Sequence, residues 1–176
     1  MQNEKPRGNG TSKEHSLIIL KSDAVEQEIC LEVLRRIVEE TSCRIVAMKI
    51  ARLTSPILRE HYAHIADKPF FPEIEKYMMK TEVWIAILEG RNGCIEKIRN
   101  ILGATNPNDA ADGTIRAEYG KAEGKNIFNV AHASDSTEAA RREIPIFFRE
   151  DEVSSLMPDL ARRIWTDATE MQTQNS

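Results

Sequence analysis

The stretch N-V-A-H-A-S-D-S-T-E-A-A-R-R-E at residues 129–143 decides the fold prediction, because it predicts a buried strand that runs directly into a helix. The apolar run at residues 127–133 is rich in β-formers and is typical of a buried strand. The polar residues that follow are of the kind that cap helix N-termini, and Asp135 and Glu138 have the spacing of a capping box. The helix should end near Pro145.

A histidine therefore lies at the mouth of a strand-to-helix turn, where free backbone N–H groups favour an anion such as phosphate. A lone histidine near a strand end is more often structural than catalytic. His132, however, has an amide, Asn129, and the polar side chains of Ser134, Asp135 and Glu143 close by in the sequence. A neutral imidazole is a competent nucleophile, and a carboxylate on its other nitrogen fixes the tautomer. The pattern favours nucleophilic chemistry at His132.

The composition predicts one globular domain. The chain has 176 residues, 41% of them hydrophobic, and a net charge of −4. No apolar run approaches the roughly 18 residues of a membrane span, and the acidic charge argues against nucleic acid as the main partner. We expect residues 1–14 to be a disordered polar tail and residues 15–176 to be a single domain.

The cysteines predict neither a zinc site nor a disulfide framework. Cys30, Cys43 and Cys94 are odd in number, far apart, and have no histidine at ligand spacing. We expect three buried, reduced thiols in a cytoplasmic protein.

Hydrophobic periodicity predicts an α+β fold of the ferredoxin-like type. It predicts strands at residues 16–21, 43–53, 83–88 and 127–133. It predicts helices at residues 29–40, from 55 to the break at 67–69, at 70–80, at 94–102, after the fourth strand, and at 151–171 with an interruption at Pro158. Without the helical hairpin inserted at residues 55–80, the order is βαββαβ, a four-stranded antiparallel sheet with helices on one face. A long structureless loop at residues 104–125 would be functional.

The signature N-x-x-H-A-S-D-S at residues 129–136 resembles the active-site signature of the nucleoside diphosphate kinases, and the likeness extends over residues 16–148. The resemblance implies a ferredoxin-like fold and transfer of the γ-phosphate of ATP, GTP or another nucleoside triphosphate to a nucleoside diphosphate. In this family the histidine carries the phosphoryl group, so His132 would be the nucleophile. Ser134 and Glu143 would orient it.

The resemblance also implies the nucleotide contacts. The phosphates would be held by Lys21, Tyr62, Arg99, Thr105 and Arg116. The base would stack on Phe70 and pack against Ile74, and Asn129 would bind the ribose. Mg²⁺ would be carried by the nucleotide, with Asp135 as a contact through water, and the protein would be a tetramer or hexamer built from dimers.

The sequence differs from the family pattern in two places. The turn K-S-D-A at residues 21–24 replaces the family's K-P-D-G, and the segment between Arg116 and Asn129 is longer than in most of the family. Asn129 and His132 would also point to opposite faces of a regular strand. The chain must therefore twist or bulge between them if both serve one site.

Two alternatives compete with this interpretation. The first is a catalytically weak nucleotide-binding or regulatory module of the same fold, which the complete set of matching residues argues against. The second is RNA binding on the sheet, which needs exposed aromatic residues on a central strand. The strand at residues 83–88 offers only Trp84, so we set the second alternative aside.

Overall fold

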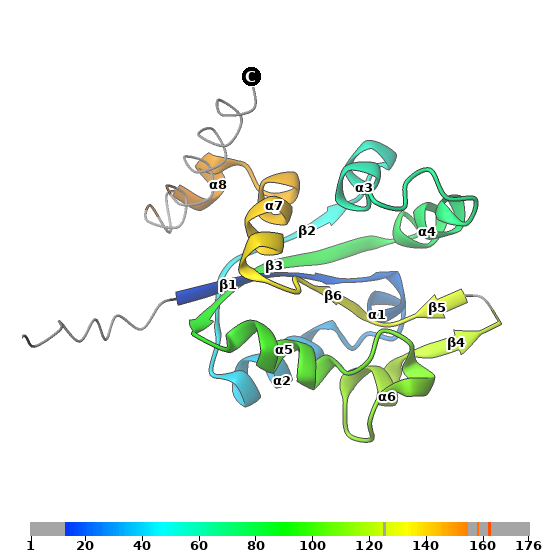
Figure 1. Ribbon diagram of the computed structural model, residues 1–176, viewed down its shortest axis with the longest axis horizontal. Coiled ribbons are helices and arrows are strands. Elements are labelled where there is room, and N and C mark those ends of the chain that lie inside the picture. The colour runs from blue at the N-terminus through cyan, green and yellow to red at the C-terminus, as the bar shows by residue number, and fades with distance from the viewer. Residues whose placement is uncertain (1–12, 125, 155–157, 159–161, 163–176) are drawn as a thin grey trace, which may run out of the picture.

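A four-stranded antiparallel sheet organises the part of the chain that the computed structural model describes, which is residues 13–124, 126–154, 158 and 162 (Figure 1). Its strands are β1 (Lys13–Leu20), β2 (Arg44–Arg52), β3 (Glu82–Arg91) and β6 (Ala131–Ala133), in the order β2-β3-β1-β6. All three pairings are antiparallel, which confirms the predicted ferredoxin-like α+β fold. Within these residues, no helix has the length and apolar character needed to cross a membrane.

Helices cover both faces of the sheet, whereas the sequence predicted one covered face. The side chains of β1 alternate, so that Ile18 and Leu20 face one core cluster while Leu17 and Ile19 face another. The first face is covered by α1 (Ser22–Glu26), α2 (Cys30–Thr41), α5 (Cys94–Leu102) and α6 (Ile115–Tyr119). The second is covered by α3 (Ser55–His61), α4 (Phe71–Met78), α7 (Thr137–Phe147) and α8 (Glu150–Ser154). The inserted hairpin α3–α4 and the C-terminal helices therefore build the second layer.

The predicted loop at residues 104–125 has structure of its own. Besides α6 it contains η1 (Pro107–Asp109) and β4 (Lys121–Glu123), and β4 pairs with β5 (Asn126–Phe128) in a separate two-stranded sheet. These elements have three to five residues each, which is too short to produce a periodic pattern in the sequence. The prediction of a structureless loop was wrong.

The predicted strand at residues 127–133 is broken in the middle. Val130 has a φ of 67°, in the left-handed region that β-branched residues rarely adopt. The Asp23 carboxylate accepts a hydrogen bond from the Val130 N–H at 2.8 Å, and the Lys21 N–H donates to the Val130 carbonyl at 2.9 Å. The expected irregularity between Asn129 and His132 is thereby confirmed, and the turn after β1 holds it in place.

Helix α7 differs from its prediction at both ends. Ser136, not Asp135, is the N-cap, and its hydroxyl accepts a hydrogen bond from the Ala139 N–H at 3.0 Å. The helix continues through Pro145 to Phe147. A proline removes one N–H from a helix, here the one that would donate to the carbonyl of exposed Arg141 four residues earlier.

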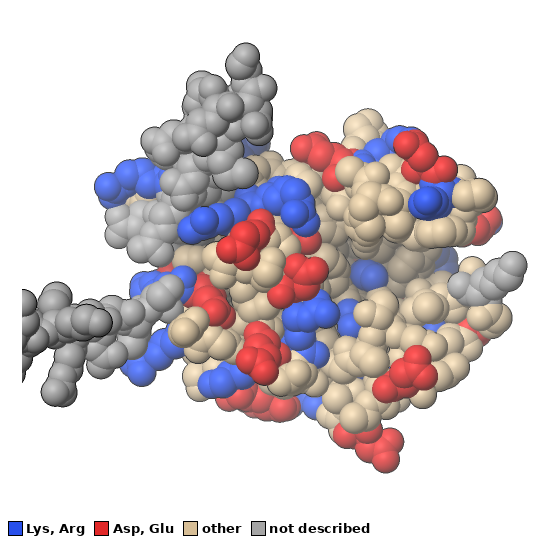
Figure 2. Space-filling view, in the orientation of Figure 1, with Lys and Arg blue, Asp and Glu red and all other residues tan. Residues whose placement is uncertain are grey.

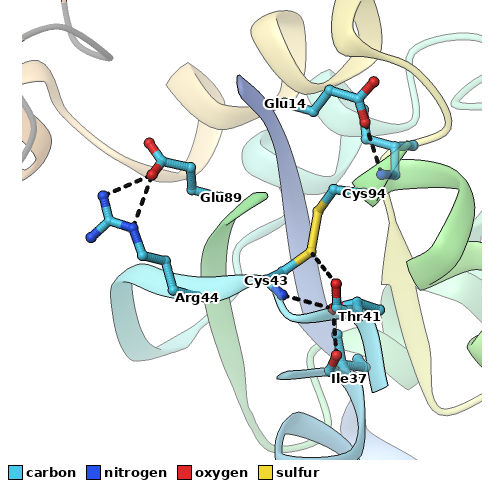
Figure 3. The surroundings of a disulfide bond; sticks show 8 residues. Glu14, Ile37, Thr41, Cys43, Arg44, Glu89 and Cys94 are labelled. Atoms are coloured by element: carbon cyan, nitrogen blue, oxygen red, sulfur yellow. Dashed lines mark hydrogen bonds and ion pairs between the residues drawn. A yellow bond between two sulfur atoms is a disulfide. The ribbon is translucent and has the colours of Figure 1, made fainter. Parts of the chain in front are cut away.

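Two of the three cysteines are joined, which corrects the expectation of three reduced thiols. Cys43 precedes β2 and Cys94 begins α5, and the fold brings their Cα atoms to 6.6 Å and their sulfurs into a disulfide (Figure 3). Cys30 is free and buried. A Cβ atom on Gly90 would lie 2.4 Å from the Cys94 sulfur, so the bridge requires glycine at this position. A spacing of 51 residues gave no hint of this tertiary contact.

The predicted C-terminal helix at residues 151–171 is described only in part. Helix α8 ends at Ser154, and residues 155–157, 159–161 and 163–176 lie outside the described residues, as do residues 1–12 of the predicted tail. Strand β1 begins at Lys13, earlier than the predicted residue 16, so the last two residues of the predicted tail at residues 1–14 belong to the sheet.

Candidate functional site

His132, Glu143 and Ser134 form one hydrogen-bonded unit at the junction of β6 and α7. The His132 Nε2 atom lies 3.0 Å from Glu143 Oε2, and the Ser134 hydroxyl donates to the same oxygen at 2.7 Å. Ser134 is itself fixed, because its hydroxyl accepts from the Leu17 N–H at 2.9 Å on β1. The predicted orienting pair is thus brought to the predicted histidine.

This arrangement assigns different tasks to the two nitrogens of His132. Burial alone would raise the pKa of the Glu143 carboxyl, but the hydrogen bond and charge of His132 and the Ser134 hydroxyl together hold that pKa below its usual value. An ionised carboxylate only accepts hydrogen bonds, so Nε2 carries the proton. The lone pair is then on Nδ1, the nitrogen that Glu143 does not engage.

Lys21 and Asn129 lie side by side where the turns after β1 and β5 meet. The Lys21 ammonium donates to Asn129 Oδ1 at 2.6 Å, and Asn129 Nδ2 donates to the Thr105 carbonyl at 2.9 Å. Burial, and next the charge of Arg116, lower the pKa of Lys21 to about 8. The amine is therefore still mainly protonated at neutral pH, and its poor solvation favours an anionic ligand.

The guanidinium of Arg116 is buried and binds backbone carbonyls next to the site. Its Nε, Nη1 and Nη2 atoms donate to the carbonyls of Asn129, Gly103 and Ala131 at 3.1, 2.8 and 2.6 Å. Burial, and next the charge of Arg99, lower the pKa of Arg116 to about 10, so the side chain remains charged. One buried arginine therefore ties the broken strand to the end of α5.

A pocket of about 790 Å³ opens beside these residues, between the α3–α4 hairpin and the β4–β5 ribbon. Figure 2 shows its mouth as a hollow with basic atoms on its floor. Six of the predicted nucleotide contacts line it: Lys21, Tyr62, Phe70, Ile74, Thr105 and Asn129. Phe70 is 53% exposed, although it is a large aromatic residue, and this exposure suits a side chain that covers a planar ligand.

Several predicted residues lie outside the lining of this pocket. His132, Ser134 and Glu143 are not among the lining residues, but the ring of His61 contacts both His132 and the pocket-lining Tyr62. Arg99 is exposed on the last turn of α5, and Asp135 is exposed after β6. Arg99 is close enough to Arg116 for its charge to lower the pKa of that residue. Asp135 is exposed and has no described contact with His132, Ser134 or Glu143.

Sequence reasoning missed the roles of two residues. Asp23 is buried, supports Val130 and accepts a hydrogen bond from the Tyr77 hydroxyl. His61, interpreted from the sequence as a surface or structural residue, is buried with its ring centroid 4.6 Å from that of His132. The lysine–x–aspartate spacing after β1 was a signal for Asp23, whereas no pattern in the sequence marks the contact between the two histidines.

Comparison with known proteins agrees with this geometry. The family model described as nucleoside diphosphate kinase matches residues 14–153. A nucleoside diphosphate kinase of Pyrococcus abyssi is 40% identical over 141 residues, covering 80% of this chain and 87% of the relative. One of Streptococcus thermophilus is 46% identical over 136 residues, covering 77% and 98%.

Solved structures are similar as well. The Aquifex aeolicus nucleoside diphosphate kinase superposes with a TM-score of 0.73 at 36% identity, covering 81% of this chain and 99% of that one. A Borrelia burgdorferi nucleoside-diphosphate kinase, described as a transition-state mimic with vanadate and ADP, superposes with a TM-score of 0.72 at 29% identity, covering 80% and 90%.

Proposed function

Because the chain belongs to the nucleoside diphosphate kinase family, we propose that His132 is the residue that carries the phosphoryl group between nucleotides. One observation supports this assignment above the others: Glu143 engages Nε2 and leaves the lone pair on Nδ1, next to a pocket that Lys21 and Phe70 line. A nucleophile held by an ionised carboxylate beside an anion site suits covalent phosphoryl transfer.

The reaction proceeds in two matched halves. The Nδ1 lone pair of His132 attacks the γ-phosphorus of a nucleoside triphosphate, the P–N bond forms, and the bond to the β-phosphate oxygen breaks so that a diphosphate leaves. A second diphosphate then attacks the phosphohistidine in the reverse sense. Lys21 and Tyr62 supply charge and hydrogen bonds to the phosphates, since burial raises the pKa of Tyr62 to about 12 and keeps its hydroxyl protonated.

Mg²⁺ fits this scheme as a companion of the nucleotide. Within the described residues, the one group of three potential ligands contains two imidazoles and a single carboxylate, whereas Mg²⁺ prefers an oxygen set. The phosphates would therefore hold the ion, and Asp135, which is exposed after β6, would contact it only through water. When bound, it would neutralise charge on the phosphates.

Two-substrate kinetics test the function directly. With ATP and a second nucleoside diphosphate varied together, the double-reciprocal plots should be parallel lines, as for a ping-pong enzyme. Intersecting lines would show direct transfer without the histidine intermediate. Nucleotide binding without turnover would instead support a regulatory module of the same fold.

Removing the charge of Glu143 should slow the first half-reaction. Glu143→Gln leaves the shape but weakens the preference for a proton on Nε2, so we expect the rate of phosphohistidine formation to fall by about 10²-fold. Rapid-quench measurement with labelled ATP gives this rate. Glu138→Gln, at an exposed position on the same helix, is the control and should react at the wild-type rate.

Removing the Phe70 ring should weaken nucleotide binding without altering the chemistry. Stacking on a base contributes about 1–3 kcal/mol, so Phe70→Ala should raise the KM for nucleoside diphosphates by about tenfold and leave kcat nearly unchanged. The rise should be similar for adenine, guanine and cytosine nucleotides, because stacking does not read base edges. Leu31→Ala, at a residue that is 70% exposed and not among the pocket-lining residues, should leave KM unaltered.

The exposed edge of the sheet supports the proposal that this chain forms dimers. Strand β2 is an edge strand of the four-stranded sheet, and Ile45, Met48 and Ile50 on it are 40%, 48% and 51% exposed. An apolar edge strand pairs readily with another copy. By sedimentation velocity the protein should run as a multiple of 20.0 kDa. The double variant Met48→Lys, Ile50→Lys should dissociate, and Met79→Lys, at the exposed residue that follows α4, should not.

Whether dimers associate further into tetramers or hexamers is decided by the same measurement. We also propose a cytoplasmic location, where nucleotide pools are used. The Cys43–Cys94 bond argues in the other direction, since disulfides persist mainly in oxidising compartments. Fractionation of cells that express the full chain distinguishes a cytoplasmic location from an oxidising compartment.

A further inference from the structure

His61 has a feature that the proposed reaction does not use. It is 9% exposed, and within the described part of the chain neither of its ring nitrogens has a hydrogen-bond partner. Its ring instead makes edge contacts with Tyr62, His132 and Phe147 at centroid distances of 4.5, 4.6 and 5.1 Å. Burying polar atoms without partners costs free energy, and a phenylalanine would fill this apolar position without that cost. The nitrogens therefore indicate a ligand.

The surroundings of His61 indicate the chemical class of that ligand. His61 on α3, His132 on β6 and Glu143 on α7 each offer one ligand atom, and these atoms lie within 4.8 Å of one another. Two imidazoles and one carboxylate are a ligand set typical of Zn²⁺, and neither imidazole suits Mg²⁺. The ligands at this site therefore favour Zn²⁺ over Mg²⁺, the ion that accompanies the nucleotide.

The distances are close to those a tetrahedral ion needs. Two ligands about 2.0–2.1 Å from Zn²⁺ at a tetrahedral angle are roughly 3.3 Å apart. His132 Nε2 and Glu143 Oε2 already lie at 3.0 Å, a contact that a proton now bridges. The 4.8 Å limit on the separation of the ligand atoms exceeds this distance by about 1.5 Å, so a shift of the His61 ring by at most about that amount would complete three ligands. A fourth position would stay open for water.

We propose that Zn²⁺ binds to His61, His132 and Glu143 and inhibits phosphoryl transfer by removing the lone pair of the nucleophile. The ion takes the place of the proton on His132 Nε2, and the displaced proton moves to Nδ1, the nitrogen that would attack phosphorus. Since a phosphoryl group on Nδ1 leaves that proton no place to move, binding of Zn²⁺ and formation of phosphohistidine exclude each other. The inhibition rests on the proposed role of His132, whereas the binding does not.

Titration calorimetry with zinc chloride and the full chain tests the binding. The wild-type protein should take up one Zn²⁺. His61→Phe preserves the ring contacts but removes a ligand, so it should weaken the Zn²⁺ affinity at least tenfold, because even the loss of a group that hydrogen-bonds to a metal ligand typically has an effect of that size. His64→Phe, at an exposed histidine three residues on, should bind as the wild type does. Far-UV circular dichroism and the melting temperature show that each variant is folded.

A second measurement uses the wild-type protein alone and does not depend on the folding of a variant. Co²⁺ in place of Zn²⁺ should give the visible absorption of a tetrahedral nitrogen and oxygen site, without an intense thiolate band that would place the ion on a cysteine. Treatment with ATP and Mg²⁺, followed by removal of nucleotide, should abolish Co²⁺ uptake.

The outcomes separate this inference from the proposed function. Equal Zn²⁺ affinity in His61→Phe and wild type, or an intense thiolate band, overturns the inference even if the enzyme is a working kinase. Zn²⁺ binding that His61→Phe abolishes, in a protein that never forms phosphohistidine, sustains the metal site and overturns the role given to His132.

Discussion

His132→Ala should reduce kcat by about 10⁴-fold or more while the protein still binds nucleotide. The loss is large because the substitution removes the only group proposed to form a covalent bond with phosphorus, and enzymes that lose a nucleophile retain only the contribution of positioning. The nucleotide pocket should survive, because His132 is not among the residues that line it. Ser134 still donates to Glu143, so the buried carboxylate keeps a partner in the variant.

The control for this variant is His64→Ala, at an exposed histidine of the same chain. Steady-state rates and the nucleotide dissociation constant should be measured for both. His64→Ala should match the wild type in each quantity. If His132→Ala kept a tenth of the wild-type kcat, phosphoryl transfer would have to use another group, and the assignment would be wrong.

Arg116→Lys should lower both the melting temperature and the activity, although it keeps the charge. The guanidinium donates to three backbone carbonyls at once, and an ammonium cannot span three separated acceptors. The Asn129 carbonyl also accepts a hydrogen bond from the Ala131 N–H at 2.6 Å, but each carbonyl that is left without a donor costs about 1–3 kcal/mol. For a domain of this size that corresponds to a fall of about 10 °C in the melting temperature.

The effect of Arg116→Lys on activity should exceed what the loss of stability explains. The carbonyls that Arg116 holds belong to Gly103, Asn129 and Ala131, and the last two flank the left-handed Val130 that turns the chain toward His132. Misplacing reacting groups by about 1 Å can cost roughly 10²-fold in rate, so we expect kcat to fall by about that factor at a temperature where the variant is fully folded.

Arg35→Lys is the matched control, because Arg35 pairs only with exposed Glu32 and Glu39 on α2 among its described contacts. Such surface pairs contribute little to stability. Its melting temperature should therefore stay within about 2 °C of wild type. A melting temperature of Arg116→Lys equal to that of Arg35→Lys would show that the three carbonyl contacts carry no weight.

The sequence predicted the larger elements because their patterns are long. Residues 94–102 were predicted as a helix and form α5 with those same ends, and the apolar run at residues 83–88 lies in the central strand β3. Local patterns failed where the structure depends on tertiary contacts. The second layer of helices and the Cys43–Cys94 bond join segments distant in the sequence. The β4–β5 ribbon is local, but its strands have three residues each and are too short to give a periodic pattern.

In the candidate site, too, the sequence predicted some contacts and missed others. The family resemblance of the signature around His132 implied its partner Glu143 and its neighbour Ser134, and the three residues lie on β6, on α7 and in the turn between them. The pattern could not show that Arg116 points to carbonyls, since a guanidinium suits phosphate and carbonyl oxygens alike. Nor could it show the burial of His61 against His132, which depends on how α3 packs over the sheet.

The most direct test of the central claim is to trap the phosphorylated protein. The full chain is incubated with γ-labelled ATP and Mg²⁺, freed of nucleotide, and examined for label that survives base but not acid. We expect one label per chain on His132, and its quantitative transfer to GTP when GDP is added. Protein that turns over substrate but carries no acid-labile label, or carries it in His132→Ala, would contradict the account.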